Sequence, residues 1–234
     1  IYSDFTKNLN NYSSDPQNSN FVNHCLSDYL PSLRDYRIEF QISNTHVEPM
    51  VFKKTSYDDT QSYRPYVYSV SKDSYFNFLE VGSGLSFIAP ILCGIQISRF
   101  GIIQQPELHL HPKAQCEMGD VFISGINSWK ADGERRVSYM IETHSENLLL
   151  RVSRRIRECT YNKTLDKNLK VSPDDVAIYY FEPQKSGKDS GFTKVHHIRF
   201  DQDGEFLDRW PDGFFAERQD EYPDEWWDEK PTKK

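Results

Sequence analysis

The stretch Ile102–Pro112 constrains the fold more than any other part of the sequence. An apolar pair runs into two glutamines and Pro106, after which leucine and histidine alternate up to a second proline. Pro106 cannot donate a hydrogen bond to a neighbouring strand, and it favours an extended backbone at Gln105. The pattern predicts a buried strand that ends abruptly. In an α/β sheet, side chains at the carboxyl end of such a strand face the crevice where ligands bind.

The elements around this stretch predict an α/β fold. In order, we expect a strand over 99–105, a helix from Pro112, a strand over 137–141, a helix capped by Ser145, and a strand over 176–181 that forms a hairpin with 192–200. Alternating strands and helices indicate a parallel sheet core with crossover helices, here with an antiparallel hairpin at one edge.

Four segments are expected along the chain. Residues 1–32 form a polar connection with a short helix around Phe21–Tyr29, and residues 33–78 alternate apolar and polar positions, which predicts a small antiparallel sheet that flanks the core. Residues 79–200 form the core. Residues 201–234 form an acidic, aromatic tail suited to docking, with a turn at Asp203-Gly204 near its start.

Composition excludes some classes of protein. A net charge of −7 argues against wrapping nucleic acid with the whole surface, although a local basic patch stays open. The four cysteines show no zinc-ligand spacing, so reduced thiols in a cytoplasmic protein are expected. No apolar run approaches the roughly 18 residues that cross a bilayer, and no signal peptide opens the chain. The absence of an initiating methionine suggests a piece of something longer.

Two further patterns have more than one interpretation. The run Val81–Ser86 leads into a helix predicted to reach about Ser98, and a glycine–serine helix start exposes backbone N–H groups that suit a phosphate. The alternative is an ordinary helix start with glycine in a tight turn. Pro90 should kink this helix or lie in its first turns. The arginines between 151 and 157 indicate a solvated or ion-paired face, with a phosphate track as the alternative.

Three segments, taken together, resemble the carboxyl-terminal half of an ABC-type ATPase head. Residues 81–86 resemble the signature motif, residues 101–112 resemble the Walker B strand and D-loop, and residues 142–146 resemble the switch-histidine segment. The class includes SMC-like proteins, OLD-family ATPases and AAA proteins of bacterial anti-phage defence. The tail around 210–215 resembles the end of a poorly characterised bacterial subfamily. The likeness covers about residues 75–225 and implies a P-loop NTPase-like half.

The resemblance implies ATP and Mg²⁺ as cofactors and a homodimer with ATP sandwiched between two heads. In such heads the signature serine and glycines contact the γ-phosphate held by the opposite subunit, and the switch histidine contacts that phosphate or the attacking water. The residues implied are His144, Gln105 and Glu107 for catalysis; Gly82, Ser83, Gly84, Ser86, Gln104 and His111 for nucleotide binding; and Gln104 and Glu142 for the metal. His109 and His111 would lie near the dimer seam, or else simply be polar side chains beside a core strand.

The chain departs from the family pattern in two ways. No G-x-x-x-x-G-K-[S/T] motif occurs, so a separate Walker A segment has to cradle the phosphates, and the chain alone should bind ATP poorly. The usual Mg²⁺ carboxylate and catalytic base positions hold Gln104 and Gln105, and a neutral amide is a poor base and a weak Mg²⁺ ligand. Glu107 or Glu142 could supply the missing charge. Slow hydrolysis, with ATP as a clamp, is the alternative.

Three functions remain open at this point. The first is a regulatory ATPase head that controls an effector such as a nuclease or toxin, in phage defence or DNA repair, with DNA as a further partner. The second is a non-hydrolysing scaffold that docks a partner protein through the tail, which the two glutamines favour. The third is a nuclease, for which no clustered carboxylate motif can be assigned.

Overall fold

The computed structural model describes five stretches of the chain: residues 22–43, 62–97, 100–130, 137–184 and 191–211. Contacts divide the chain into two units. The first comprises Ile1–Arg151 with Lys167–Leu169, and the second comprises Val152–Asp166 with Lys170–Lys234.

An antiparallel sheet lies near the start of the first unit. Two short helical turns precede it, η1 (Cys25–Tyr29) and η2 (Pro31–Leu33), and its strands are β1 (Tyr36–Ser43), β2 (Ser62–Ser69) and β3 (Ser74–Phe76), in that order. Ile38 and Val67 face each other across β1 and β2, and both are buried. The alternating pattern therefore predicts β1 and the end of β2. The strand expected over 50–52 lies outside the described residues, and β3 was not expected.

The helix after the glycine–serine run begins earlier than predicted. Helix α3 spans Ser83–Ile97, so Ser83 to Ser86 form its first turn rather than a loop that leads into it. Pro90 lies inside the helix, in its second turn, where the missing N–H removes one helical hydrogen bond. Leu85, Ile88 and Leu92 are buried, at the spacing of one helix face.

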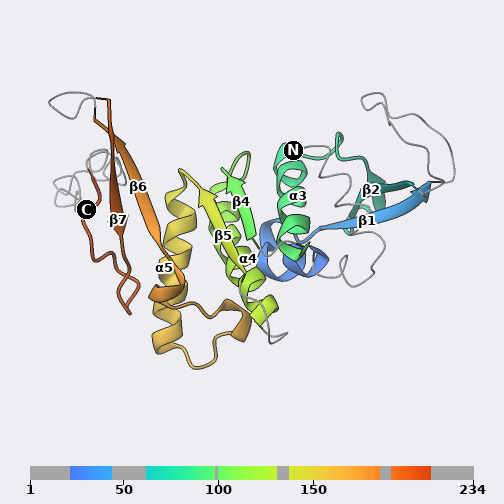
Figure 1. Ribbon diagram of the computed structural model, residues 1–234. Coiled ribbons are helices and arrows are strands. Elements are labelled where there is room, and N and C mark those ends of the chain that lie inside the picture. The colour runs from blue at the N-terminus through green and yellow to red at the C-terminus, as the bar shows by residue number, and fades with distance from the viewer. Residues whose placement is uncertain (1–21, 44–61, 98–99, 131–136, 185–190, 212–234) are drawn as a thin grey trace, which may run out of the picture. The chain divides into compact units, whose positions relative to one another are not determined.

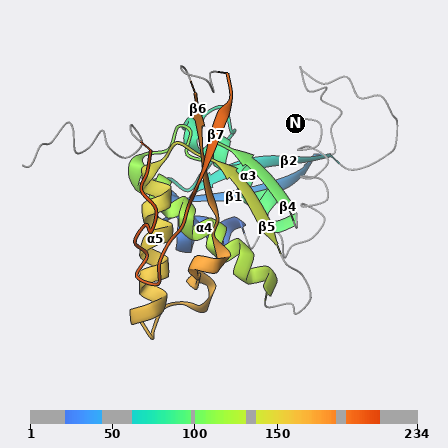
Figure 2. The same ribbon diagram turned by 60° about the vertical axis from the view of Figure 1, so that its left-hand side comes forward.

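A parallel β-α-β unit forms the centre of the first unit. Strand β4 (Phe100–Gln104) continues through a turn into helix α4 (Pro112–Lys130) and then strand β5 (Ser138–Glu142). The two strands pair in parallel from Phe100 with Ser138 to Gln104 with Glu142. Figures 1 and 2 both show β4 and β5 side by side. The predicted strand, crossover helix and strand are confirmed, with Pro112 as the first residue of α4.

Only one face of this sheet is covered by the described part of the chain. Tyr139 packs its ring against Phe122 of α4 and donates a hydrogen bond from its hydroxyl to the carbonyl of Ile95 in α3, at 3.4 Å. Burial there raises the pKa of Tyr139. On the opposite face Phe100, Ile102 and Met140 are 58%, 69% and 61% exposed. The expectation of a fully buried strand is therefore wrong for these residues.

The second unit contains a β-hairpin. Helix α5 (Glu146–Tyr161) starts in the first unit and ends in the second, and the turns η3 (Lys167–Leu169) and η4 (Pro173–Asp175) follow it. Strands β6 (Ile178–Pro183) and β7 (Thr193–Ile198) form the predicted antiparallel hairpin. Among the described pairings β6 bonds to β7 alone, so the parallel sheet has two strands where the sequence predicts three.

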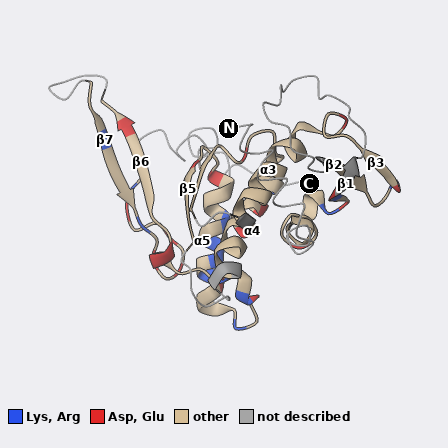
Figure 3. Cartoon of the chain, turned by 45° about the vertical axis from the view of Figure 1, so that its right-hand side comes forward, with Lys and Arg blue, Asp and Glu red and all other residues tan. Residues whose placement is uncertain are grey.

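The arginines of α5 are ion-paired, as one of the two interpretations predicts. Arg151 pairs with Asp120, Arg154 and Arg155 pair with Glu158, and Arg157 pairs with Glu205. Figure 3 shows the blue segments that these basic residues give the helix. Their charges are therefore neutralised locally.

No helix in the described stretches combines the length and apolar character needed to cross a bilayer.

Candidate functional site

The carboxyl ends of the two parallel strands meet at one level. Gln104 and Glu142 are register partners, and Nε2 of Gln104 donates a hydrogen bond to Oε2 of Glu142 at 3.1 Å. One residue further on, the backbone N–H of Gln105 donates to the carbonyl oxygen of Glu142 at 2.7 Å. The two segments that the sequence singles out therefore converge, because parallel strands end at the same edge of a sheet.

A tight turn follows β4. The N–H of Leu108 donates to the carbonyl of Gln105, and the N–H of Leu110 donates to the carbonyl of Glu107, both at 3.1 Å. Gln105 and His109 have φ of 46° and 60°. Residues other than glycine rarely adopt this left-handed region, which costs about 1–2 kcal/mol per residue. Two strained residues thus bracket Glu107, and backbone strain of this kind concentrates at functional sites.

Glu107 is buried, with 8% of its surface exposed. Its Oε1 accepts a hydrogen bond from the backbone N–H of His144 at 2.8 Å. Its Oε2 is also inaccessible to solvent and has no hydrogen-bond partner among the described residues. The turn after β4 is therefore tied to the segment after β5 through a carboxylate that keeps one oxygen free.

Gln115 makes a second link between the two segments. Its Oε1 accepts hydrogen bonds from Oγ of Ser145 at 2.8 Å and from Nδ2 of Asn147 at 3.1 Å, and its Nε2 donates to the carbonyl of Leu110 at 3.0 Å. Ser145 Oγ also accepts a hydrogen bond from the N–H of Leu148, which confirms the predicted helix cap. One amide thus joins the turn and the first turns of α4 and α5.

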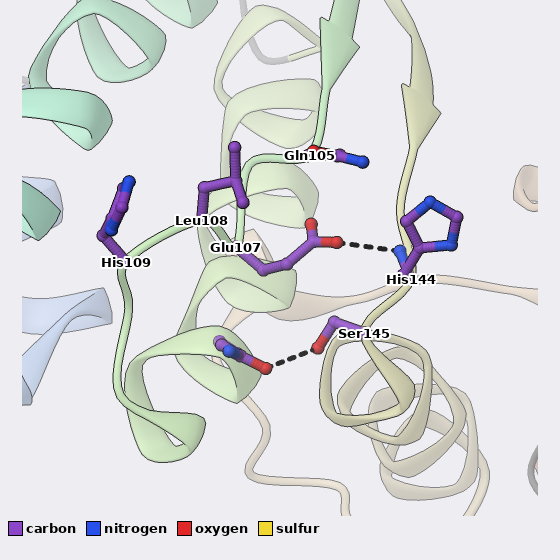
Figure 4. A pocket seen from close by; sticks show the side chains of 7 residues that line it. Gln105, Glu107, Leu108, His109, His144 and Ser145 are labelled. Atoms are coloured by element: carbon purple, nitrogen blue, oxygen red, sulfur yellow. Dashed lines mark hydrogen bonds between the residues drawn. The ribbon is translucent and has the colours of Figure 1, made fainter.

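These segments enclose a pocket of about 300 Å³ (Figure 4). Glu107 extends from the turn toward the backbone of His144, with Gln105 on another side. The side chains that line the pocket are polar or aliphatic and include no lysine or arginine; they are Gln105, Glu107, Leu108, His109, Gln115, His144 and Ser145. All belong to the first unit.

The glycine–serine segment, residues 82–86, packs against the turn at His109 and does not line the pocket. A Cβ on Gly84 would lie 2.9 Å from the carbonyl oxygen of His109, so only glycine lets α3 approach the turn this closely. The rings of Phe87 and His109 are also in contact, with centroids 4.8 Å apart. Oγ of Ser86 donates to the carbonyl of Phe78 at 2.8 Å, whereas Gly82 and Ser83 are exposed at the start of α3.

The residues predicted from sequence thus fall into four groups, one of which is the glycine–serine segment 82–86 outside the pocket. Gln105, Glu107 and His144 line one pocket, and Gln104 and Glu142 form a hydrogen-bonded pair at the neighbouring strand ends. His111 is exposed outside the pocket, where its Nδ1 accepts a hydrogen bond from the N–H of Lys113. The described stretches contain no group of three or more His, Cys, Asp or Glu side chains placed to hold a metal ion.

Sequence reasoning missed Gln115. Its only signal is a polar residue one turn into α4, next to the buried Ala114 and ahead of the buried Met118. Such a residue is more often solvated, and nothing in the sequence indicates that it reaches the segment after β5.

A model of a protein family matches part of the chain. The sequence model of a family described as "Protein of unknown function (DUF3696)" matches residues 171–229. No curated protein matches the chain. The family match covers the hairpin of the second unit, and the pocket lies outside it.

Proposed function

We propose that this chain is the carboxyl-terminal part of an ABC-type ATPase head that dimerises around ATP and regulates a partner effector. The observation that carries the proposal is that Gln105, Glu107 and His144, from two adjacent strand ends, line the same pocket. The family matched at residues 171–229 is often found in AAA/ATPase-like proteins, which supports the same assignment.

In this proposal the pocket receives the end of a nucleoside triphosphate and the water that attacks it. His144 is exposed at the pocket wall, where its imidazole can donate a hydrogen bond to a phosphate oxygen. Gln104 and Glu142 present an amide and a carboxylate together, and such oxygens fit as part of a Mg²⁺ site that phosphate oxygens and water complete. When bound, Mg²⁺ neutralises charge on the phosphates.

Another segment has to hold most of the triphosphate. The pocket lining has no lysine or arginine, and it includes a carboxylate that repels phosphate. The sequence also lacks a P-loop. The exposed face formed by Phe100, Ile102 and Met140 supports a missing Walker A half, because parallel sheets are normally covered on both faces.

The exposed start of α3 suits a role in the dimer. Gly82 and Ser83 lie at the surface, at the amino end of a 15-residue helix whose dipole favours an anion. We propose that they approach the nucleotide of the opposite subunit. The effector, the involvement of DNA and the role in phage defence or repair follow from the resemblance alone.

A second candidate is a scaffold that does not hydrolyse ATP. One observation favours it: the side chains of Gln104 and Glu142 are hydrogen-bonded to each other, so the strand ends are already satisfied without a metal. In that case the fold serves to dock a partner protein.

The two candidates differ in phosphate release. We expect the protein with its Walker A half, given ATP and Mg²⁺, to release phosphate, and His144→Ala to lower the rate about 100-fold because a donor to the terminal phosphate is lost. His24→Ala is the matched control, since this histidine lies on the surface beside Asp28. Size-exclusion chromatography with and without ATP measures dimerisation in parallel.

Equal background rates in wild type and His144→Ala would favour the scaffold. A dimer that forms only with ATP would preserve the clamp even without turnover. A protein that neither dimerises nor releases phosphate with ATP would contradict the proposed function.

A further inference from the structure

The hairpin of β6 and β7 has an exposed face that is apolar. Its register pairs Tyr179 with His197 and Phe181 with Val195, and partners across two strands point to the same face. Tyr179, Phe181 and Val195 are 57%, 64% and 51% exposed. The ring of His197 stacks on that of Tyr179, with centroids 5.0 Å apart. The solvated face of an antiparallel sheet is normally polar, so this apolar face marks an interaction surface.

The opposite face of the hairpin is already packed. Ile198 of β7 is buried, and the ring of Tyr180 lies edge-on to that of Trp210, with centroids 6.2 Å apart. Nε2 of His196 and Oε2 of Glu182 are 2.8 Å apart on the same side. The hairpin is therefore held in place from one side, and its aromatic face is presented on the other.

We propose that residues 212–229 of this chain pack on the exposed face of the hairpin. The described part of the chain ends at Pro211, next to Trp210, so this segment starts beside β6. A strand of six residues, such as β6, is about 20 Å long at about 3.3 Å per residue. The segment is thus long enough to turn around the edge of the hairpin and follow its length.

The composition of the segment fits this face. Its aromatic side chains are Phe214, Phe215, Tyr222, Trp226 and Trp227. Such rings bury large apolar areas and pair favourably with other rings. The segment is also acidic, whereas the side chains of the exposed face include no carboxylate; they are Tyr179, Phe181, Pro183, Thr193, Val195 and His197. Its Asp and Glu residues therefore meet no like charge on these side chains and can stay in water.

The family match is a separate observation in favour of this pairing. The match runs without interruption from residue 171, before β6, to residue 229. It takes in both strands of the hairpin and the whole proposed segment, and it stops before the final lysines. Because a family model represents many related sequences, hairpin and segment occur together in them, as expected when one packs on the other.

Phe181→Ser in the full chain tests the proposal, because it removes the most exposed ring of the face. Hydroxyl-radical footprinting measures how fast the side chains of Trp226 and Trp227 are oxidised, at two protein concentrations and without ATP. A synthetic peptide of residues 212–234 gives the rates for uncovered rings. Phe192→Ser is the matched control: this phenylalanine is 71% exposed and precedes β7, out of phase with Val195.

We expect both tryptophans to be oxidised about tenfold more slowly in the wild-type chain than in the peptide, which corresponds to about 1.4 kcal/mol of docking free energy. Phe181→Ser should restore the rates of the peptide, and Phe192→Ser should keep those of the wild type. The buried Met118 reports on the fold and should stay protected in every variant. Both substitutions are at the surface, where the effect on stability is small.

Three results would overturn the proposal. The first is a wild-type chain whose tryptophans are oxidised as fast as those of the peptide. The second is a Phe181→Ser variant that behaves like Phe192→Ser. The third is protection that increases with protein concentration, since the segment would then lie on a second copy of the chain. No step uses ATP, so each of these results leaves the proposed ATPase function to its own test.

Discussion

At the scale of single residues, one amide organises the site. Gln115 uses both polar atoms of its side-chain amide and links α4 to the turn at Leu110 and to the start of α5 at Ser145 and Asn147. Net contributions of such hydrogen bonds are about 1 kcal/mol each, and a partner left unsatisfied adds to the cost of removing them. The arrangement is therefore stabilising as well as positioning.

We expect Gln115→Ala to lower the free energy of unfolding by about 1–3 kcal/mol, because three hydrogen bonds are lost and the partly buried Ser145 hydroxyl loses its acceptor. Urea unfolding followed by circular dichroism measures the change. Gln202→Ala, in an exposed turn, is the control and should be close to neutral. Equal losses in the two variants would contradict the role given to Gln115.

At the scale of elements, Gly204 allows the turn between Phe200 and Phe206 to pack against helix α5. Gly204 has a φ of 74°, and its N–H donates to the carbonyl of Asp201 in the turn between Phe200 and Phe206, whose rings stack. A Cβ at this position would lie 2.2 Å from the carbonyl oxygen of Ser153 in α5. The turn needs glycine both for its backbone angle and for its approach to the helix.

Gly204→Ala and Gly191→Ala separate these two requirements. Gly191 also has positive φ, at 91°, but a Cβ there would meet nothing within 4 Å. We expect Gly191→Ala to cost about 1 kcal/mol from the backbone angle alone, and Gly204→Ala to cost about 1–3 kcal/mol more from the clash with α5. Thermal unfolding of the two variants checks the order, and a Gly191→Ala that melts as low as Gly204→Ala would contradict it.

Elements with a strong pattern could be predicted from the sequence. Pro112 and Ser145 mark the starts of two helices because their chemistry is local, and the convergence of Gln104 and Glu142 follows from parallel pairing. The early start of α3 could not be predicted, since its first turn is held by close packing of Gly84 on His109. The open face at Ile102 was missed because an apolar run does not reveal whether anything covers it.

The free oxygen of Glu107 was also beyond the sequence. Glu107 and Glu142 are chemically equal in the printed chain, and the sequence offers both as a source of charge. Only burial and hydrogen bonding distinguish a paired surface carboxylate from an unpaired buried one. These depend on the turn geometry, which left-handed angles at two residues other than glycine decide against local preference.

At the scale of the whole molecule, the exposed apolar face of β4 and β5 is the feature that bears most on association. Phe100, Ile102 and Met140 are adjacent apolar side chains that are all more than half exposed. Contiguous apolar patches mark interaction sites or cause association, whereas single exposed residues are ordinary. We therefore expect the isolated chain to self-associate through this apolar patch.

We expect Ile102→Thr to reduce self-association and binding of a hydrophobic dye by the isolated chain, because threonine keeps strand preference and removes apolar surface. Leu79→Thr is the control, since this leucine is 98% exposed in the turn after β3 and belongs to neither β4 nor β5. Sedimentation velocity and dye fluorescence measure the effect. A larger reduction in self-association from Leu79→Thr than from Ile102→Thr would show that the exposed face of β4 and β5 does not drive the association.

The open strand face also bears on how the protein is made in a cell. Strand β4 leaves the ribosome before the 19 residues of α4 and then β5, so parallel pairing has to wait for the whole crossover. Throughout that interval, and after it, Ile102 and its neighbours expose apolar surface of the kind that chaperones bind and that promotes the aggregation of nascent chains. The yield of folded protein in the cell should therefore depend on how quickly those side chains are covered during translation.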